Sequence, residues 1–147
     1  MNSLLKTHDS IGLVANSNGI DIANKNKIDN LIEALKDLGL NPILSPVFYK
    51  KQGPFNGSGK ERADILNTYF KDTNIKAIFD LSGGDLSNET LDYIDFQVIS
   101  NNPKPFFGYS DLSTLLNAIN SNGNITTYHY QLRHLIGKYS IEQKEYF

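Results

Sequence analysis

One turn of the sequence carries a serine that could act as a nucleophile. Gly108-Tyr109-Ser110-Asp111 follows the apolar pair Phe106-Phe107 and precedes a helical pattern. A strand-to-helix turn of this kind exposes the hydroxyl at its apex and points the following backbone N–H groups the same way. A serine just before a helix is more often an N-cap, so the turn alone leaves both interpretations open. Leu112 replaces the second glycine of G-x-S-x-G, which disfavours an ordinary α/β-hydrolase.

A glycine pair could supply the amides that acyl transfer from such a serine needs. Gly83-Gly84 follows the apolar segment 75–81 after Ser82, and glycine lets the main chain approach a developing oxyanion closely. A plain tight turn is the alternative, because paired glycines after a strand are common. The pair is no dinucleotide fingerprint, since G-x-G-x-x-G is absent and Asp85 would oppose a pyrophosphate.

The remaining titratable residues offer little organised chemistry. His129 and His134 lie near or after the last predicted strand, and we expect structural or solvated roles for both. The aspartates in and near the predicted turns are Asp80, Asp85, Asp92 and Asp95. None has metal-ligand spacing to a histidine. The sequence therefore implies no metal and no cofactor.

Alternating strand and helix patterns must position these turns. Apolar runs bounded by turn residues predict strands at 10–15, 41–46, 75–81, 106–108 and 125–128. Apolar residues at helical spacing predict helices over 28–38, from 59 to 70 and over 112–119, and Leu91, Ile94 and Ile99 suggest a short helix and an irregular crossover. Because parallel strands need crossover connections, we expect an α/β domain with a mostly parallel sheet and helices on both faces.

Local signals mark the ends of two helices. Gly39 follows the first helix where a left-handed C-cap residue is expected, and Ser58 with Glu61 has the spacing of a capping box. The longest irregular stretch, 47–57, is either a substrate-facing flap or, as we favour, a surface loop. Ligands bind beyond the carboxyl ends of parallel strands, so Asn16, Gly84 and Ser110 should share one concave surface.

Length and composition exclude several classes of protein. The 147 residues, 39% hydrophobic and 20% charged, suit one domain with a substantial core. A net charge of -2 with scattered basic residues gives no surface for nucleic acid. No stretch approaches the ~20 apolar residues of a membrane span. Without cysteine there is no disulfide, so we expect a soluble, cytoplasmic protein.

Several segments occur along the chain in a characteristic order and spacing: Glu61-Arg62-Ala63-Asp64, Ile75-Lys76-Ala77-Ile78, Gly83-Gly84, Leu91-Asp92-Tyr93-Ile94-Asp95, Asn102-Pro103-Lys104-Pro105 and Gly108-Tyr109-Ser110-Asp111. Together they resemble the amino-terminal domain of LD-carboxypeptidases and their microcin C self-immunity relatives. The resemblance covers about 11–128. It implies a layered domain of the class I glutamine-amidotransferase-like or flavodoxin-like kind, and a Ser-Glu-His triad.

The resemblance also implies roles for particular residues. Ser110 would be the nucleophile, and the backbone N–H groups of Gly84 and Asp111 would form the oxyanion hole. The implied substrate-binding residues are Gly83, Asp85, Ser87 and Asn88. The family's glutamate and histidine lie in a separate carboxy-terminal domain. We therefore expect a nucleophile domain over 1–130 and a helical tail over 131–147 that leads toward that domain.

Some positions depart from the family pattern. His129-Tyr130 stands where Gly-Pro is usual, and Glu89 where murein-type members tend to carry arginine. Ser87-Asn88 is closer to the microcin-immunity branch.

Two functions stay open on the sequence. One is hydrolysis of an amide bond beside a free carboxylate, in a murein LD-peptide or a microcin-like peptidyl-nucleotide, incomplete on this chain. The other is an inactive, truncated or split family member that acts as a binding or interaction domain. Expected partners are the small substrate, a carboxy-terminal domain in cis or trans, and a second copy in a homodimer. A flavodoxin-like receiver or flavin module lacks an evident acceptor site or pocket.

Overall fold

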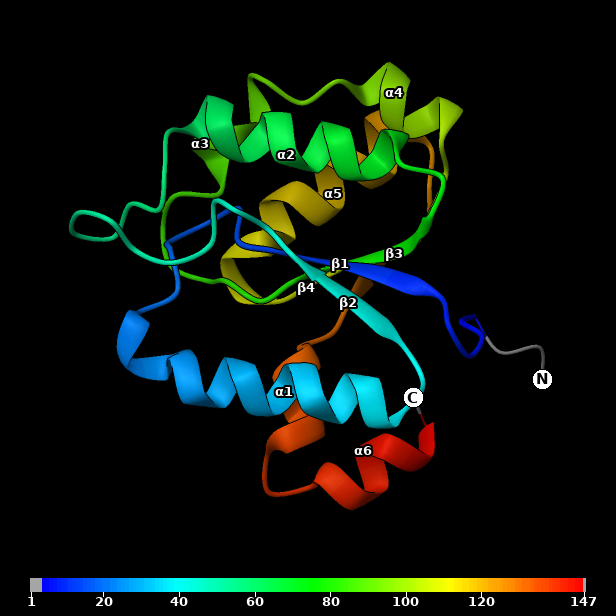
Figure 1. The fold of residues 1–147 in the computed structure, drawn as a ribbon. Helices are drawn as coiled ribbons and strands as arrows, with labels where there is room; N and C mark the ends of the chain where they lie inside the picture. Colours follow the sequence, from blue (N-terminus) through cyan, green and yellow to red (C-terminus); the bar gives the residue numbers. More distant parts are fainter. Residues whose placement is uncertain (1–3, 147) are drawn as a thin grey trace.

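Five parallel strands form the centre of the computed structural model, which describes residues 4–146 (Figure 1). They are β1 (Ser10–Val14), β2 (Asn41–Leu44), β3 (Ile75–Asp80), β4 (Phe106–Gly108) and β5 (Thr127–His129). Their order is β2-β1-β3-β4-β5, and every neighbouring pair is parallel. The predicted α/β class and parallel sheet are confirmed.

Helices connect the strands and follow the last one. The α-helices are α1 (Lys25–Asp37), α2 (Gly59–Lys71), α3 (Asn88–Leu91), α4 (Phe96–Asn101), α5 (Ser113–Gly123) and α6 (Ser140–Tyr146). The 3₁₀ helices are η1 (Ile22–Asn24), η2 (Ser110–Leu112) and η3 (Leu132–Ile136). Among residues 4–146 no helix is long and apolar enough to cross a bilayer.

Both predicted helix-end signals are confirmed. Gly39 has a φ of +82°, the left-handed conformation that follows a helix without cost only in glycine. The Ser58 hydroxyl accepts from the Glu61 N–H, and the Glu61 carboxylate accepts from the Ser58 N–H. This reciprocal pair satisfies donors that would otherwise lack partners at the start of α2.

Two predicted elements differ in extent. The crossover expected to hold one short helix with Leu91, Ile94 and Ile99 holds two, α3 and α4, because the Asp95 carboxylate accepts from the Val98 N–H and starts a second helix. The last strand begins at Thr127 rather than Ile125. Ile125 is apolar because it packs into the core, and pairing with β4 starts only where Thr127 meets Phe106.

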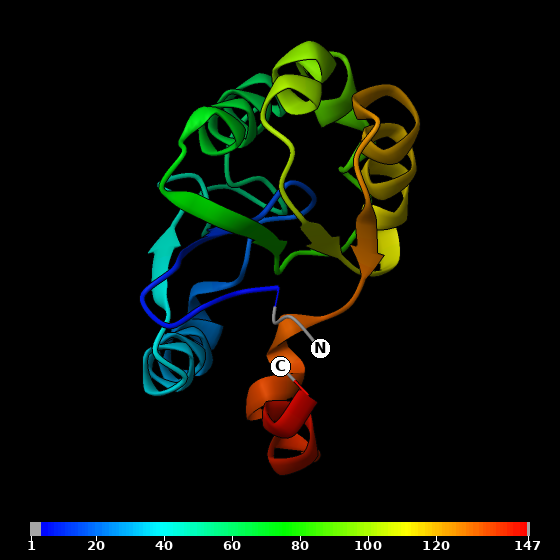
Figure 2. The same cartoon turned by 90° about the vertical axis from the view of Figure 1, so that its right-hand side faces the viewer.

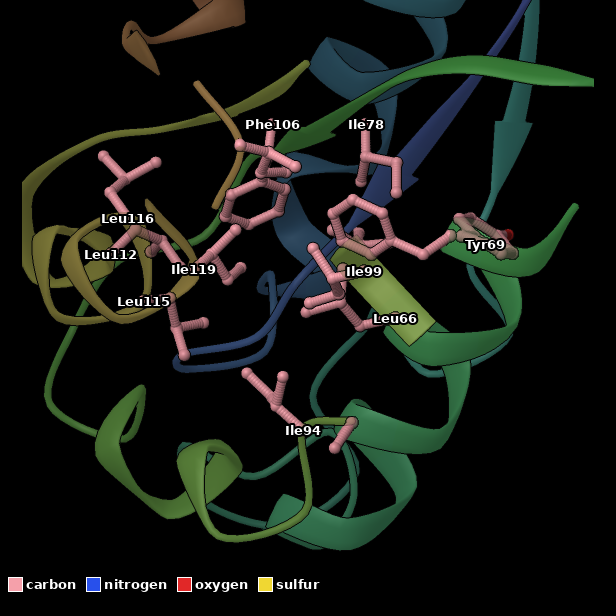
Figure 3. Close-up of a cluster of buried hydrophobic side chains, with 14 of the residues drawn as sticks. Leu66, Tyr69, Ile78, Ile94, Ile99, Phe106, Leu112, Leu115, Leu116 and Ile119 are labelled. Atoms are coloured by element: carbon pink, nitrogen blue, oxygen red, sulfur yellow. The ribbon is translucent and has the colours of Figure 1, made fainter. Parts of the chain in front are cut away.

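The sheet separates two apolar layers (Figures 1 and 2). On one face α2, α4 and α5 pack on residues such as Ile78 and Phe106; Figure 3 shows this cluster. On the other face α1 and η3 pack together over Leu13 and Phe79. Helices therefore cover both faces of the sheet, as predicted.

The tail after β5 belongs to the second layer. Leu132 and Leu135 of η3 are fully buried among the residues of α1 and of the sheet. Beyond them α6 packs against η3 (Figure 2). The tail thus contributes to the core of the domain, and the domain boundary expected at residue 130 stays a prediction.

Candidate functional site

Ser110 has the backbone of an exposed, strained turn. β4 ends at Gly108, Tyr109 is extended, and Ser110 has a φ of +59°. A residue with a side chain adopts this conformation rarely, and such strain is concentrated at functional sites. Ser110 is exposed, whereas Leu112 two residues later is buried beside Leu116 (Figure 3). The turn is therefore anchored from below while its apex faces solvent.

The N-cap interpretation of Ser110 is not supported. Within residues 4–146, no hydrogen bond involves the Ser110 hydroxyl, and η2 follows Tyr109 without a side-chain cap. Gly108 is needed for packing, since a Cβ there would lie 2.9 Å from Cβ of Leu112. The sequence around Ser110 is thus explained by the shape of the turn and not by helix capping.

The Gly84 turn lies against the turn that follows β1. Gly84 has a φ of +134°, and a Cβ there would be 2.2 Å from Cγ of Asn18. The next backbone N–H, that of Asp85, donates to Asn18 Oδ1 at 3.2 Å. Both the conformation and the close approach require glycine at this position. Gly84, Asp85 and Asn88 are exposed, and Gly83 is half-buried.

The Asp111 side chain joins the turns after β1, β3 and β4. Its Oδ2 accepts from the Ser17 hydroxyl at 2.5 Å and from the Ser87 N–H at 3.0 Å. The Ser87 hydroxyl donates to the Asp111 carbonyl at 2.9 Å. Ser87 is fully buried. The turns selected from the sequence therefore meet at one edge of the sheet.

Asp80 is the buried centre of a second set of hydrogen bonds at this edge. Asn16 donates to Asp80 Oδ2 from its backbone N–H and its side-chain amide, both at 2.9 Å. Ser82 donates to Oδ1 from its N–H at 2.9 Å and its hydroxyl at 2.6 Å. Burial raises the pKa of the Asp80 carboxyl, and these hydrogen bonds offset part of the rise. Asp80 thereby ties the turn after β1 to the turn after β3.

Arg62 of α2 holds the same loop from the helix side. Its guanidinium donates to Thr90 Oγ1 (3.2 Å), Gly57 O (2.8 Å), Leu86 O (3.2 Å) and Glu89 Oε2 (2.9 Å). Thr90 in turn donates to the Asn16 carbonyl at 3.1 Å. The Arg62 side chain has no exposed surface, whereas Glu89 is 43% exposed. The negative charge of Glu89 is therefore paired with the Arg62 guanidinium, which is shielded from solvent.

In the part of the chain that the structure describes, His129 and His134 take no part in the hydrogen bonds that join the turns at this edge of the sheet. His129 ends β5, is exposed, and its ring lies 4.9 Å from that of Tyr109 between centroids. His134 is exposed on η3, with its ring 6.2 Å from that of Tyr130. Over residues 4–146 neither histidine hydrogen-bonds to Ser110, and no three acidic or histidine side chains gather as metal ligands would.

Sequence reasoning singled out the Ser110, Gly84 and Asp111 positions but missed most of the residues that bring them together. Ser17, Asp80 and Thr90 had no motif of their own. Arg62 was noted only as part of the segment that resembles the family. Its position beside Ala63 on the inner face of α2 is a signal in the sequence, because a charged residue on a buried face needs hydrogen-bond partners. The turns could be predicted, whereas the contacts between them could not.

Known proteins are similar to this chain in sequence and in fold. A family model described as the LD-carboxypeptidase N-terminal domain matches residues 11–130. The "Probable murein peptide carboxypeptidase" of Bacillus subtilis (strain 168) is 32% identical over 125 residues, which are 85% of this chain and 38% of that protein. The microcin C7 self-immunity protein MccF of Escherichia coli is 30% identical over 125 residues, 85% of this chain and 36% of its own length.

Solved structures agree with the sequence matches. MccF in complex with aspartyl sulfamoyl adenosine superposes with a TM-score of 0.87 at 28% identity, over 97% of this chain and 43% of that one. The MccF-like protein from Bacillus anthracis gives a TM-score of 0.81 at 30% identity, over 88% of this chain and 40% of its own. The chain thus spans about two fifths of the length of these relatives. Fold, sequence and extent of the match together show that the chain belongs to the LD-carboxypeptidase family, whose amino-terminal domain it contains.

Proposed function

We propose that this domain supplies the nucleophile and the oxyanion hole of a serine carboxypeptidase that cleaves an amide bond beside a free carboxylate. The observation that carries the proposal is the backbone of Ser110: an exposed serine with φ +59° directly after a parallel strand. The turns after β1 and β3 are hydrogen-bonded to Asp111, the residue that follows Ser110. Serine hydroxyls presented this way are typical of acyl-transfer sites.

The proposed chemistry uses Ser110 and two backbone amides. Ser110 Oγ attacks the amide carbonyl carbon, and the N–H groups of Gly84 and Asp111 donate to the oxygen on which negative charge develops. The intermediate collapses with cleavage of the C–N bond, and the proton taken from Ser110 passes to the departing amine; water then attacks the acyl-enzyme, which releases the acid and restores the Ser110 hydroxyl. A base must take the Ser110 proton, and we assign it to the glutamate and histidine of the family's carboxy-terminal domain, in cis or in trans.

Two substrate classes fit the proposal. The Bacillus subtilis relative is named as a probable murein peptide carboxypeptidase, and solved structures of MccF contain aspartyl sulfamoyl adenosine or glutamyl sulfamoyl guanosine. We therefore propose a murein LD-peptide or a peptidyl-nucleotide as the substrate. Gly83, Asp85 and Asn88 reach the surface beside Gly84 and are our candidates for substrate contact. Ser87 was a fourth candidate, but its burial favours an indirect role.

A second candidate function is binding without turnover. It is favoured by one observation: no histidine or carboxylate within residues 4–146 hydrogen-bonds to Ser110. A serine hydroxyl without a base is almost wholly protonated at neutral pH, and general-base assistance contributes ~10²–10⁴-fold to such reactions. In this case the domain keeps ligand contacts or a partner domain but performs no chemistry.

A reconstitution assay separates the two functions. The chain is assayed alone and after addition of the carboxy-terminal domain of a family member, with release of terminal D-alanine and of a nucleotide product measured separately. We expect turnover only in the mixture, abolished by Ser110→Ala and retained by Ser121→Ala, an exposed serine on α5. Absence of turnover in the mixture with retained ligand binding supports the second function.

Turnover by the chain alone would contradict the assignment of the base. His129→Gln and His134→Gln, each tested in the isolated chain, would then identify a base within the chain itself.

A further inference from the structure

We infer that Ser17 and Ser87 are positioning residues that act through Asp111 to hold the strained backbone of Ser110. The role of this arrangement in catalysis rests on the proposed function, whereas its effect on the turn does not. Neither Ser17 nor Ser87 lies in a motif that points to such a role, and both side chains are internal.

Burial removes both hydroxyls from contact with a substrate. Ser17 and Ser87 have 0% exposed surface. A buried hydroxyl without a partner is costly, so both must be engaged within the protein. Each donates to Asp111: Ser17 to the carboxylate at 2.5 Å, and Ser87 to the backbone carbonyl at 2.9 Å.

The hydrogen bonds fix Asp111 at its backbone and at its side chain. A single carboxylate oxygen, Oδ2, accepts from both the Ser17 hydroxyl and the Ser87 N–H. Hydrogen bonds to an ionised acceptor are shorter and roughly twice as strong as neutral ones. With its carbonyl held by Ser87 as well, the residue has little freedom to rotate.

Asp111 is the immediate neighbour of Ser110, and the peptide bond between them is planar. Fixing Asp111 therefore fixes one end of the Ser110 backbone, and the buried Leu112 extends the anchor into the core. A left-handed conformation is unfavourable for a residue with a side chain, so it persists only where the surroundings impose it. Ser17 and Ser87 supply that restraint from the two neighbouring turns.

The restraint is measured without an assay of activity. Amide hydrogen exchange over residues 108–112 is compared in the wild-type chain, Ser17→Ala, Ser87→Ala and Asp111→Ala. Each variant removes at least one hydrogen bond that Asp111 accepts, so we expect exchange in this segment to be faster by about tenfold, the effect of ~1.4 kcal/mol on local opening. Asp111→Asn keeps an oxygen that can replace Oδ2, and its exchange should lie closer to wild type.

Ser45→Ala is the matched control. Ser45 is also buried at the same edge of the sheet, and its hydroxyl takes part in two hydrogen bonds with Val47. Its replacement should leave exchange over residues 108–112 unchanged. Unchanged exchange in Ser17→Ala, Ser87→Ala and Asp111→Ala would overturn the inference. If Asp111→Ala does not fold, Ser17→Ala and Ser87→Ala, each of which deletes one oxygen atom, decide together.

A kinetic measurement tests the link to catalysis. In the reconstituted assay Ser87→Ala should lower kcat by tenfold or more and change KM by less than about twofold, because the nucleophile is displaced while the surface that binds substrate is kept. Equal kcat in Ser87→Ala and Ser45→Ala would overturn the catalytic role. If the wild-type mixture has no activity, the proposed function fails and the exchange measurement still decides whether the turn is held in this way.

Discussion

Ser110 illustrates a conflict between stability and reactivity within one residue. Its φ of +59° exposes the hydroxyl, but the same conformation is unfavourable for any residue with a Cβ. Glycine would fit the backbone better, and only serine supplies the oxygen. The free energy stored at this residue should therefore be recoverable by mutation.

Ser110→Gly should raise the free energy of unfolding by about 1 kcal/mol, because glycine adopts positive φ without steric cost. Ser110→Ala keeps the Cβ and should leave stability near the wild-type value. Urea unfolding of the three proteins, followed by circular dichroism, measures the differences. Equal stabilities of the alanine and glycine variants would mean that the turn carries no such strain.

Arg62, unlike the strained Ser110, should contribute favourably to the free energy of unfolding. Arg62→Met should lower the free energy of unfolding by about 3 kcal/mol, because it leaves the carbonyls of Gly57 and Leu86 without their donor inside the protein. Glu89→Gln should cost less, about 1 kcal/mol, because glutamine keeps an oxygen that can accept from the Arg62 guanidinium and the Glu89 side chain is 43% exposed. Chemical denaturation of both variants tests the asymmetry, and equal losses would show that the ion pair itself matters most.

At the scale of elements, the end of α2 depends on a lysine from the next crossover. Lys104 Nζ donates to the carbonyls of Tyr69 at 2.9 Å and Asp72 at 2.6 Å. These are carbonyls of the last turn, which lack partners within the helix. Burial lowers the pKa of Lys104 to about 8, the nearby Asp72 opposes that shift, and Lys76 adds to it.

This pKa predicts a pH dependence of stability. Between about pH 8 and the ordinary lysine value of 10.5, the unfolded chain binds more protons than the folded one at this position, so stability should rise with pH in that window. Lys104→Met cannot titrate and should lack this rise. Thermal unfolding of both proteins at pH 7.5 to 10.5 measures the difference, which would be constant if the pKa were not lowered.

The elements also show what a sequence can predict. The Ser58 capping box and the Gly39 C-cap depend on residues only a few positions apart, so they could be predicted directly. The second helix of this crossover, α4, was not predicted, because its Asp95 cap lies among apolar residues whose spacing fits a single short helix. The bond from Asn16 to Asp80 joins residues 64 positions apart. It depends on the register of β1 against β3, which no local pattern gives.

At the scale of the whole molecule, the tail after β5 completes the layer on the α1 face. Leu135→Ala should lower the free energy of unfolding by about 2–4 kcal/mol, because it leaves a cavity among the buried residues of that layer. Ile141→Ala on α6 is the control, since Ile141 is 76% exposed and its loss should cost little. A similar small effect of both would show that the tail is not part of the cooperative core.

The strand order has a consequence for where a ligand can enter. In sheets ordered β2-β1-β3-β4-β5 the chain switches direction between β1 and β3, and ligands of such folds usually enter the crevice there. Here that crevice is filled by the protein itself, since Asn16, Asp80 and Ser82 are each 1% exposed. A ligand at this point would have to displace their polar cluster. Because this polar cluster fills the usual crevice, we expect the proposed binding surface to lie one strand along, at the junction of β3 and β4 near Gly84 and Ser110.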